Sequence, residues 1–148
     1  MALTSTRRHT TTRHAHRNPF LLGTVFVGGA CGTAIRSLLE DAFSRPTGSW
    51  PWITFAINVI GAFVLGFLLE ALVRSGEDSG GRRLARLGVG TGLLGGFTTY
   101  STFMVETTKL PWPVAVGYAV TSVVVGALAA WAGIRAARSV TLRGGENA

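Results

Sequence analysis

A run of hydroxyl, aromatic and glycine residues occupies positions 95 to 103, Gly-Gly-Phe-Thr-Thr-Tyr-Ser-Thr-Phe, within a stretch otherwise apolar enough to cross a membrane. The hydrocarbon core of a bilayer offers no water to hydroxyl or backbone groups, so polar residues persist there only where protein or a hydrated cavity satisfies them. Gly95 and Gly96 each lower helix propensity by about 1 kcal/mol relative to alanine. We therefore expect a helix break near Gly95 to Thr99, where freed carbonyls would suit a cation and freed amides an anion.

Few other side chains in the apolar segments carry polar chemistry. Asn58 interrupts a long apolar run, where its amide serves either an interhelical hydrogen bond of about 1 kcal/mol or a polar pathway. Arg36 and Glu106 lie near segment ends, so snorkelling to the interface or simple solvation is the alternative to a functional role. Tyr118 and Ser122 are four residues apart and share one helix face, which fits packing as well as a polar surface.

The composition indicates that membrane helices position these residues. Of the 148 residues, 47% are hydrophobic and 14% are charged, and the mean hydropathy is +0.37. Such apolar content is rare in soluble domains, and the length allows one small bundle that needs oligomerisation to enclose a pore. Since about 20 apolar residues cross a bilayer, the sequence predicts an all-α membrane protein with four transmembrane helices, at about Phe20 to Leu39, Trp52 to Glu70, Leu84 to Thr107 and Pro113 to Ala132.

Glycines recur four residues apart in two of these segments, as Gly28 with Gly32 and Gly92 with Gly96. This spacing predicts close approach of helices in lipid. Outside the segments, residues 1–18 contain four arginines and no acidic residue, which predicts a disordered basic arm. The predicted organisation is therefore this arm, a four-helix transmembrane domain at 19–137 and a polar C-terminal tail at 138–148.

Three motifs, in order and spacing, resemble the CrcB/Fluc family of fluoride channels. They are Gly29-Ala-Cys-Gly-Thr-Ala-Ile-Arg36, Asn58-Val-Ile-Gly61 and Gly95-Gly-Phe-Thr-Thr-Tyr-Ser-Thr-Phe103, and the resemblance covers about Phe20 to Ala137. Each motif alone is weak, but three in register within a chain of four predicted spans are specific. The resemblance implies an antiparallel dimer of two oppositely oriented subunits, with a structural sodium ion at the interface and fluoride pathways beside it.

The resemblance also implies roles for particular residues. The backbone carbonyls of Gly95 and Thr98 would hold the sodium ion, and Arg36 and Glu106 would lie at the pore vestibules. The fluoride pathway would be lined by Asn58, Tyr100, Phe103, Ser101, Thr102, Tyr118 and Ser122. Tyr100 departs from the family, which usually has phenylalanine there, so its hydroxyl would either add a donor or occupy space in the pathway.

Basic residues are distributed unevenly between the two sides of a four-span chain. The first 18 residues contain four arginines, the link between the second and third spans together with the start of the third span has four, and the segment after Ala132 has three, all on one side. The other side has only Arg45 and Lys109, with Arg36 near its edge. By the positive-inside rule, this predicts both termini in the cytoplasm and one fixed orientation. We therefore expect pairing with a separately encoded, oppositely inserted relative; a homodimer is the alternative.

The expected function is passive, fluoride-selective export across the plasma membrane, by a multi-pass protein that is not an enzyme. A proton-coupled exporter with four spans would need a carboxylate in the middle of the first span, and none is present. A hydrolase is disfavoured because no histidine lies in any span and Ser101 has no evident base. A further alternative is a membrane protein that does not transport ions, in which the same polar residues serve only helix packing.

Overall fold

The computed structural model describes residues 18–43 and 49–145, with only the backbone from 141 onward. These residues form helices and connecting turns, and no strand occurs among them. The predicted all-α membrane class is therefore confirmed for the described part of the chain. The elements in chain order are α1 (Pro19–Ala42), α2 (Trp52–Arg74), α3 (Gly80–Ala85), the π-helix η2 (Arg86–Leu94), α4 (Gly95–Phe97), α5 (Tyr100–Lys109) and α6 (Trp112–Gly145).

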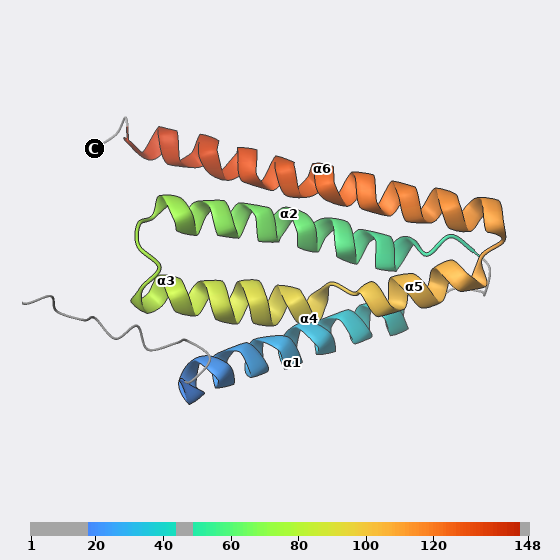
Figure 1. The fold of residues 1–148 in the computed structure, drawn as a ribbon, viewed down its shortest axis with the longest axis horizontal. Coiled ribbons are helices and arrows are strands. Elements are labelled where there is room, and N and C mark those ends of the chain that lie inside the picture. The colour runs from blue at the N-terminus through green and yellow to red at the C-terminus, as the bar shows by residue number, and fades with distance from the viewer. Residues whose placement is uncertain (1–17, 44–48, 146–148) are drawn as a thin grey trace, which may run out of the picture.

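The helices lie roughly parallel in one layered bundle (Figure 1). Helix α6 packs along α2, and the chain from α3 to α5 runs as a broken rod on the other side of α2. Helix α1 packs against η2 and α4 at the outside of that rod. In chain order, the four predicted segments correspond to α1, α2, the broken rod and α6. Across the bundle, the order is α6, α2, the broken rod and α1.

Within the described part of the chain, three helices are long and apolar enough to cross a membrane, namely Pro19–Ala42, Trp52–Arg74 and Trp112–Val140. The third predicted segment does not form one continuous helix, because α4 ends at Phe97 and α5 begins at Tyr100. Between them Thr98 has φ −73° and ψ 152°, and Thr99 has φ −142° and ψ 121°, both extended conformations. The predicted break near Gly95 to Thr99 is therefore confirmed.

Helix α6 is longer than its predicted segment and continues beyond Ala132 to Gly145. The residues expected to form a tail from 138 onward therefore begin as helix, since no proline or glycine interrupts them before Gly144. The predicted basic arm falls on residues 1–17, which lie outside the described residues, and on Asn18. The Asn18 side chain accepts a hydrogen bond from the Phe20 N–H at 3.0 Å and caps α1.

Glycines allow α1 to approach η2 and α4 with backbone against backbone, as the spacing predicts. A Cβ on Gly28 would clash with the carbonyl of Gly88, and one on Gly32 would clash with the carbonyl of Leu93. A Cβ on Gly96 would likewise meet the carbonyl of Gly29. In lipid, where apolar burial gives no driving force between helices, such close contact contributes directly to association.

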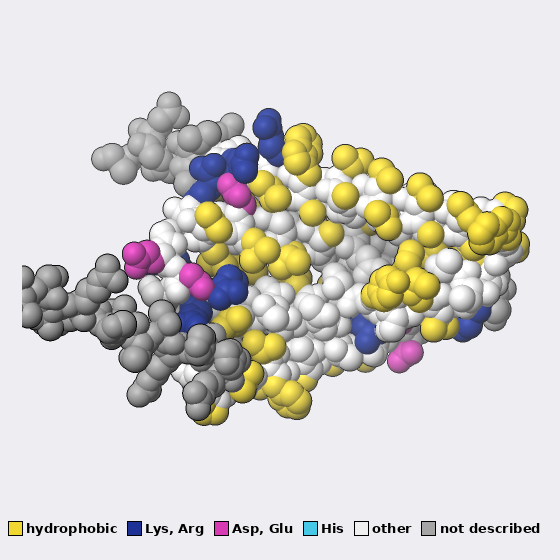
Figure 2. Space-filling view, viewed as in Figure 1, with side chains coloured by type: hydrophobic (Ala, Val, Ile, Leu, Met, Phe, Trp, Pro, Cys, Tyr) yellow, Lys and Arg dark blue, Asp and Glu magenta, His cyan; other side chains and the backbone are white. Residues whose placement is uncertain are grey.

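The link between α2 and α3 gathers charged side chains at one end of the bundle. Gly76 follows α2 with φ 114°, a left-handed conformation that favours glycine. The Arg86 guanidinium donates from Nε and Nη2 to the Asp78 carboxylate, with the shortest contact at 2.7 Å, and these hydrogen bonds hold the pKa of Asp78 below its usual value. Figure 2 shows basic and acidic side chains gathered mainly at the left end of the molecule, with hydrophobic side chains spread over the surface between the ends.

Candidate functional site

The candidate site is built on the helix break, and local sequence explains why the chain opens there. Thr98 donates its hydroxyl to the carbonyl of Leu94 at 2.9 Å, so its side chain closes the preceding helix. Thr99 is the N-cap of α5, where its hydroxyl accepts the N–H of Thr102 at 3.1 Å. Two adjacent threonines thus end one helix and start the next, directly after the pair Gly95 and Gly96.

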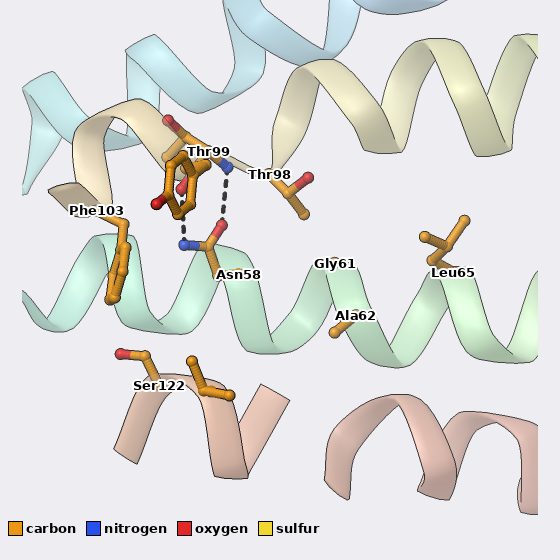
Figure 3. Close-up of a pocket in the computed structure, with 10 residues that line it drawn as sticks. Asn58, Gly61, Ala62, Leu65, Thr98, Thr99, Phe103 and Ser122 are labelled. Atoms are coloured by element: carbon orange, nitrogen blue, oxygen red, sulfur yellow. Dashed lines mark hydrogen bonds between the residues drawn. The ribbon is translucent and has the colours of Figure 1, made fainter. Parts of the chain in front are cut away.

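Asn58 of α2 binds both backbone groups of Thr99 in the break (Figure 3). Its Nδ2 donates to the Thr99 carbonyl at 3.0 Å, and its Oδ1 accepts the Thr99 N–H at 2.8 Å. The two bonds fix the orientation of the amide, because an exchanged oxygen and nitrogen would satisfy neither. The second N–H of Nδ2 is left for another acceptor, since a primary amide carries two donors.

The same contacts release two carbonyls from the helical hydrogen-bond pattern. In a continuous α-helix the Thr99 N–H would donate to the carbonyl of Gly95, but here it donates to Asn58. The Thr102 N–H would donate to the carbonyl of Thr98, but here it donates to the Thr99 hydroxyl. Gly95 is exposed on the single chain, with open space where a side chain would start. These are the two carbonyls expected to hold sodium, and hard oxygen ligands of this kind fit that ion.

Hydroxyl groups continue from the break along the start of α5. The Thr99 and Ser101 hydroxyl oxygens lie 3.2 Å apart, and the Thr99 hydroxyl donates to the Thr102 oxygen at 3.1 Å. Because its proton is used on Thr102, Thr99 accepts the proton of Ser101 in this arrangement. The hydroxyls of Ser101 and Thr102 are thus linked through Thr99 at the start of α5.

Two aromatic rings flank the hydroxyl cluster. The ring centroids of Tyr100 and Phe103 are 6.1 Å apart and inclined at 36°. Tyr100 is 75% exposed, so it projects from the surface of the single chain. Phe103 is half-buried and contacts the ring of Tyr118 on α6, with centroids 5.2 Å apart.

A groove of about 390 Å³ brings several of the predicted residues together, although they come from three different segments. Asn58 lies on α2, Ser122 on α6, and the break with the start of α5 completes the wall (Figure 3). The Ser122 hydroxyl oxygen is buried and has no hydrogen-bond partner among the described residues. The full lining is Asn58, Gly61, Ala62, Leu65, Thr98, Thr99, Tyr100, Phe103, Ser122 and Val123.

Tyr118 and Glu106 form a second polar cluster next to this groove. Tyr118 is fully buried and donates its hydroxyl to Glu106 Oε2 at 3.3 Å. Thr54 of α2 is also fully buried and donates to Glu106 Oε1 at 2.9 Å. Sequence reasoning missed Thr54, although it stands one helical turn before Asn58 and therefore on the same face of α2. Trp50 packs edge-on against Tyr118, with ring centroids 5.3 Å apart.

Arg36 does not line the groove and instead lies on the α1 side of the break. Its Nη1 contacts Glu40 at 3.1 Å, and its Nε contacts the carbonyl of Gly96 at 3.4 Å. Of the predicted site residues, the groove thus unites Asn58, Thr98, Tyr100, Phe103 and Ser122. The others surround the break or the Glu106 cluster.

Comparison with known proteins gives a consistent set of relatives. Residues 23–134 match the family model described as CrcB-like protein, Camphor Resistance (CrcB). The chain is 51% identical over 128 residues to "Fluoride-specific ion channel FluC 1" of Cutibacterium acnes, covering 84% of this chain and 90% of that protein. It is 50% identical over 147 residues to "Fluoride-specific ion channel FluC 2" of Leifsonia xyli subsp. xyli, covering 96% and 99%. A FluC protein of Geobacter sulfurreducens is 41% identical over 121 residues, covering 78% and 95%.

Proposed function

Since the chain belongs to the CrcB family, we propose that it is a fluoride-selective ion channel rather than an enzyme. The proposal rests on its similarity to proteins named fluoride-specific channels and on one structural observation. That observation is a groove beside a broken membrane helix, where the Asn58 amide, the Ser122 hydroxyl and the Phe103 ring lie together. Passive flow through it would lower cytoplasmic fluoride, because hydrogen fluoride enters cells uncharged and ionises at the higher internal pH.

The groove offers the groups that a dehydrated fluoride ion needs. Fluoride is small and strongly hydrated, so a selective pathway replaces its water with hydrogen-bond donors. The second N–H of Asn58 and the Ser122 hydroxyl, for which the described residues offer no acceptor within hydrogen-bond geometry, are such donors. The ring edges of Phe103 and Tyr100 carry partial positive charge and attract an anion without donating a proton. We assign the pathway to these residues and to Ser101, Thr102 and Tyr118, with Glu106 and Arg36 at its ends.

We further infer that a second subunit, inserted in the opposite orientation, closes the groove. Tyr100 at the break is 75% exposed and Phe26 on α1 is 76% exposed, so one chain leaves large aromatic rings uncovered. The carbonyls of Gly95 and Thr98 in each subunit would hold a sodium ion at that interface. A bound cation would supply positive potential that lowers the cost of bringing an anion into a poorly screened interior.

The charge distribution supports one fixed orientation in the plasma membrane, with both termini in the cytoplasm. Six arginines lie where α2 ends, α3 begins and α6 leaves the bundle, whereas the described part of the opposite end has Arg36 and Lys109. We therefore favour a separately encoded relative as the second subunit, with a homodimer as the alternative. The six arginines at the end where α2 and α6 finish are Arg74, Arg82, Arg83, Arg86, Arg135 and Arg138.

Fluoride efflux from liposomes, read with a fluoride electrode in sodium with chloride as control, tests the function. We expect rapid, fluoride-selective efflux either from this chain alone or after adding an oppositely oriented relative. Asn58→Asp and Phe103→Ile should abolish efflux while the protein remains folded by circular dichroism. Efflux that is equally fast for chloride, or that survives both substitutions, would contradict the proposal.

A further inference from the structure

Arg36 and Glu40 of α1 form a pair that faces the helix break. Arg36 Nη1 lies 3.1 Å from Glu40 Oε2, and the two side chains are only 19% and 23% exposed. The two residues are one helical turn apart, so the pair forms without any distortion of α1. The positive charge of Arg36 is therefore compensated within its own helix, which weakens any role as a free cation at a pore mouth.

The remaining contacts of Arg36 reach both halves of the broken rod. Its Nε lies 3.4 Å from the carbonyl of Gly96 in α4, and its Nη1 lies 3.4 Å from the Thr102 hydroxyl oxygen in α5. The Gly96 carbonyl would pair with the N–H of Tyr100 in a continuous helix, but the extended residues of the break separate them. Arg36 thus supplies a donor that the break has removed, and the Thr33 hydroxyl contacts the same carbonyl at 3.4 Å.

Through Thr102, Arg36 is connected to Asn58 on the opposite side of the break. Thr102 pairs with Thr99 through its N–H and its hydroxyl oxygen, each at 3.1 Å. Thr99 is in turn held by Asn58 through both of its backbone groups. A network of hydrogen bonds therefore runs from α1 to α2 across the break, and Arg36 forms its α1 end.

This hydrogen-bond network also determines which hydroxyl group still has a hydrogen to donate. A guanidinium has only donors, so the Thr102 oxygen must accept from Arg36 as well as from Thr99. With both of its lone pairs engaged, the Thr102 hydroxyl can act toward any further partner only as a donor. An anion needs a donor of this kind, so the polarity set by Arg36 suits an anion pathway.

We propose that Arg36, held by Glu40, is a positioning residue that braces the two halves of the broken helix and orients the Thr99 and Thr102 hydroxyls. The effect on transport rests on the proposed channel function, whereas the brace itself does not. Lysine would preserve the charge at position 36, but its single nitrogen cannot reach Gly96, Thr102 and Glu40 in the planar arrangement of a guanidinium.

Amide hydrogen exchange in nanodiscs tests the brace independently of transport. In Arg36→Lys we expect the segment from Thr98 to Phe103 to exchange about tenfold faster, as the loss of charge-assisted hydrogen bonds predicts. Arg74→Lys is the matched control, because Arg74 pairs with Glu70 one helical turn away at the far end of α2. Exchange near the break should not change in that control.

Fluoride efflux separates the brace from a simple effect of charge. Wild type and the Arg36 and Glu40 variants are compared, with the second subunit added if wild type requires it. The brace predicts that Arg36→Lys loses flux nearly as completely as Arg36→Gln, and that Glu40→Gln reduces flux or leaves it unchanged. A free cation at the mouth predicts near-normal flux in Arg36→Lys and increased flux in Glu40→Gln. Wild-type exchange in Arg36→Lys would overturn the proposal, and so would faster exchange with normal flux. A silent wild type would refute only the channel function, since exchange still decides the brace.

Discussion

At the scale of single residues, Asn58 has more than one task. Its position in an apolar run predicts either an interhelical hydrogen bond or a polar group of a pathway, and in the structure it lines the groove. The structure adds that its amide holds both backbone groups of Thr99 and so satisfies the helix break within the membrane. Only its second N–H is left for an ion. Loss of transport in an Asn58 variant therefore has two possible origins, which stability measurements separate.

Replacing Asn58 with leucine should destabilise the protein by about 2 to 3 kcal/mol, because the N–H and carbonyl of Thr99 lose their partners in a region without water. Unfolding in mixed micelles would measure the difference. Ser122→Ala is the control from the same groove, since the Ser122 hydroxyl has no partner among the described residues and its loss should change stability by less than about 0.5 kcal/mol. Equal stability of Asn58→Leu and wild type would show that the two hydrogen bonds between Asn58 and Thr99 contribute nothing to folding.

Tyr100→Phe should leave the fold intact, because the ring is 75% exposed on the single chain and its removal leaves no cavity. We expect a stability change below about 0.5 kcal/mol. The fluoride efflux rate and the fluoride-to-chloride ratio should change instead, if the hydroxyl lies in the pathway. Parallel efflux assays of the two proteins check this, and identical rates and ratios would place the hydroxyl outside the pathway.

At the scale of elements, the rod from α3 to α5 combines two departures from the α-helix. The π-helix η2 precedes the break. Its Gly92 packs directly against the backbone of α1 at Val25 and Gly28, whereas Gly90 faces leucine side chains of α2. π-helical stretches are rare and often occur at functional sites. The small residues that weaken helix propensity are thus the same ones that let α1 approach closely enough for Arg36 to contact Gly96 and Thr102.

Gly32→Ala should separate α1 from α4, because the added Cβ would meet the Leu93 carbonyl and the Phe97 backbone nitrogen, neither of which a rotamer change can move. Overpacking of this kind costs about 1 to 3 kcal/mol. Thermal unfolding in detergent would reveal the loss. Gly126→Ala serves as the control, because nothing lies within 4 Å of its added Cβ and alanine favours the helix. A normal melting temperature for Gly32→Ala would mean that the contact relaxes without penalty.

At the scale of the whole molecule, the proposed second subunit would complete a site that one chain leaves open. The groove lies beside the exposed Tyr100, and the exposed Gly95 carries one of the two carbonyls released from the helix. These features favour a second subunit on this face. The two ends of the bundle also differ in charge, since six described arginines lie where α2, α3 and α6 meet the solvent and Arg36 lies at the other end.

This charge difference predicts a single orientation in the membrane. A topology reporter fused to the C-terminus should be active only in its cytoplasmic form, as the positive-inside rule requires. The same fusion with Arg82, Arg83 and Arg86 changed to glutamine should yield a mixture of orientations. A mixture in the unaltered chain would instead support the homodimer.

Sodium should stabilise the assembled dimer if the Gly95 and Thr98 carbonyls bind it. A ligand that binds only the folded state adds about 2.7 kcal/mol at one hundred times its Kd. We therefore expect a higher melting temperature in sodium than in N-methylglucamine at equal ionic strength. An equal melting temperature in both salts would contradict a sodium site in the assembled protein.

The sequence by itself determined the membrane class, the position of the break and the polar residues beside it. Hydropathy, glycine pairs and threonine chemistry act over a few neighbouring residues, so local reasoning detects them. Only the tertiary structure decided that Asn58 binds both backbone groups of Thr99, that Thr54 and Tyr118 both donate to Glu106, and that Arg36 contacts both halves of the broken rod. These pairings join residues that are distant in the sequence, and they depend on how closely the helices pack and in what register, which periodicity alone does not specify.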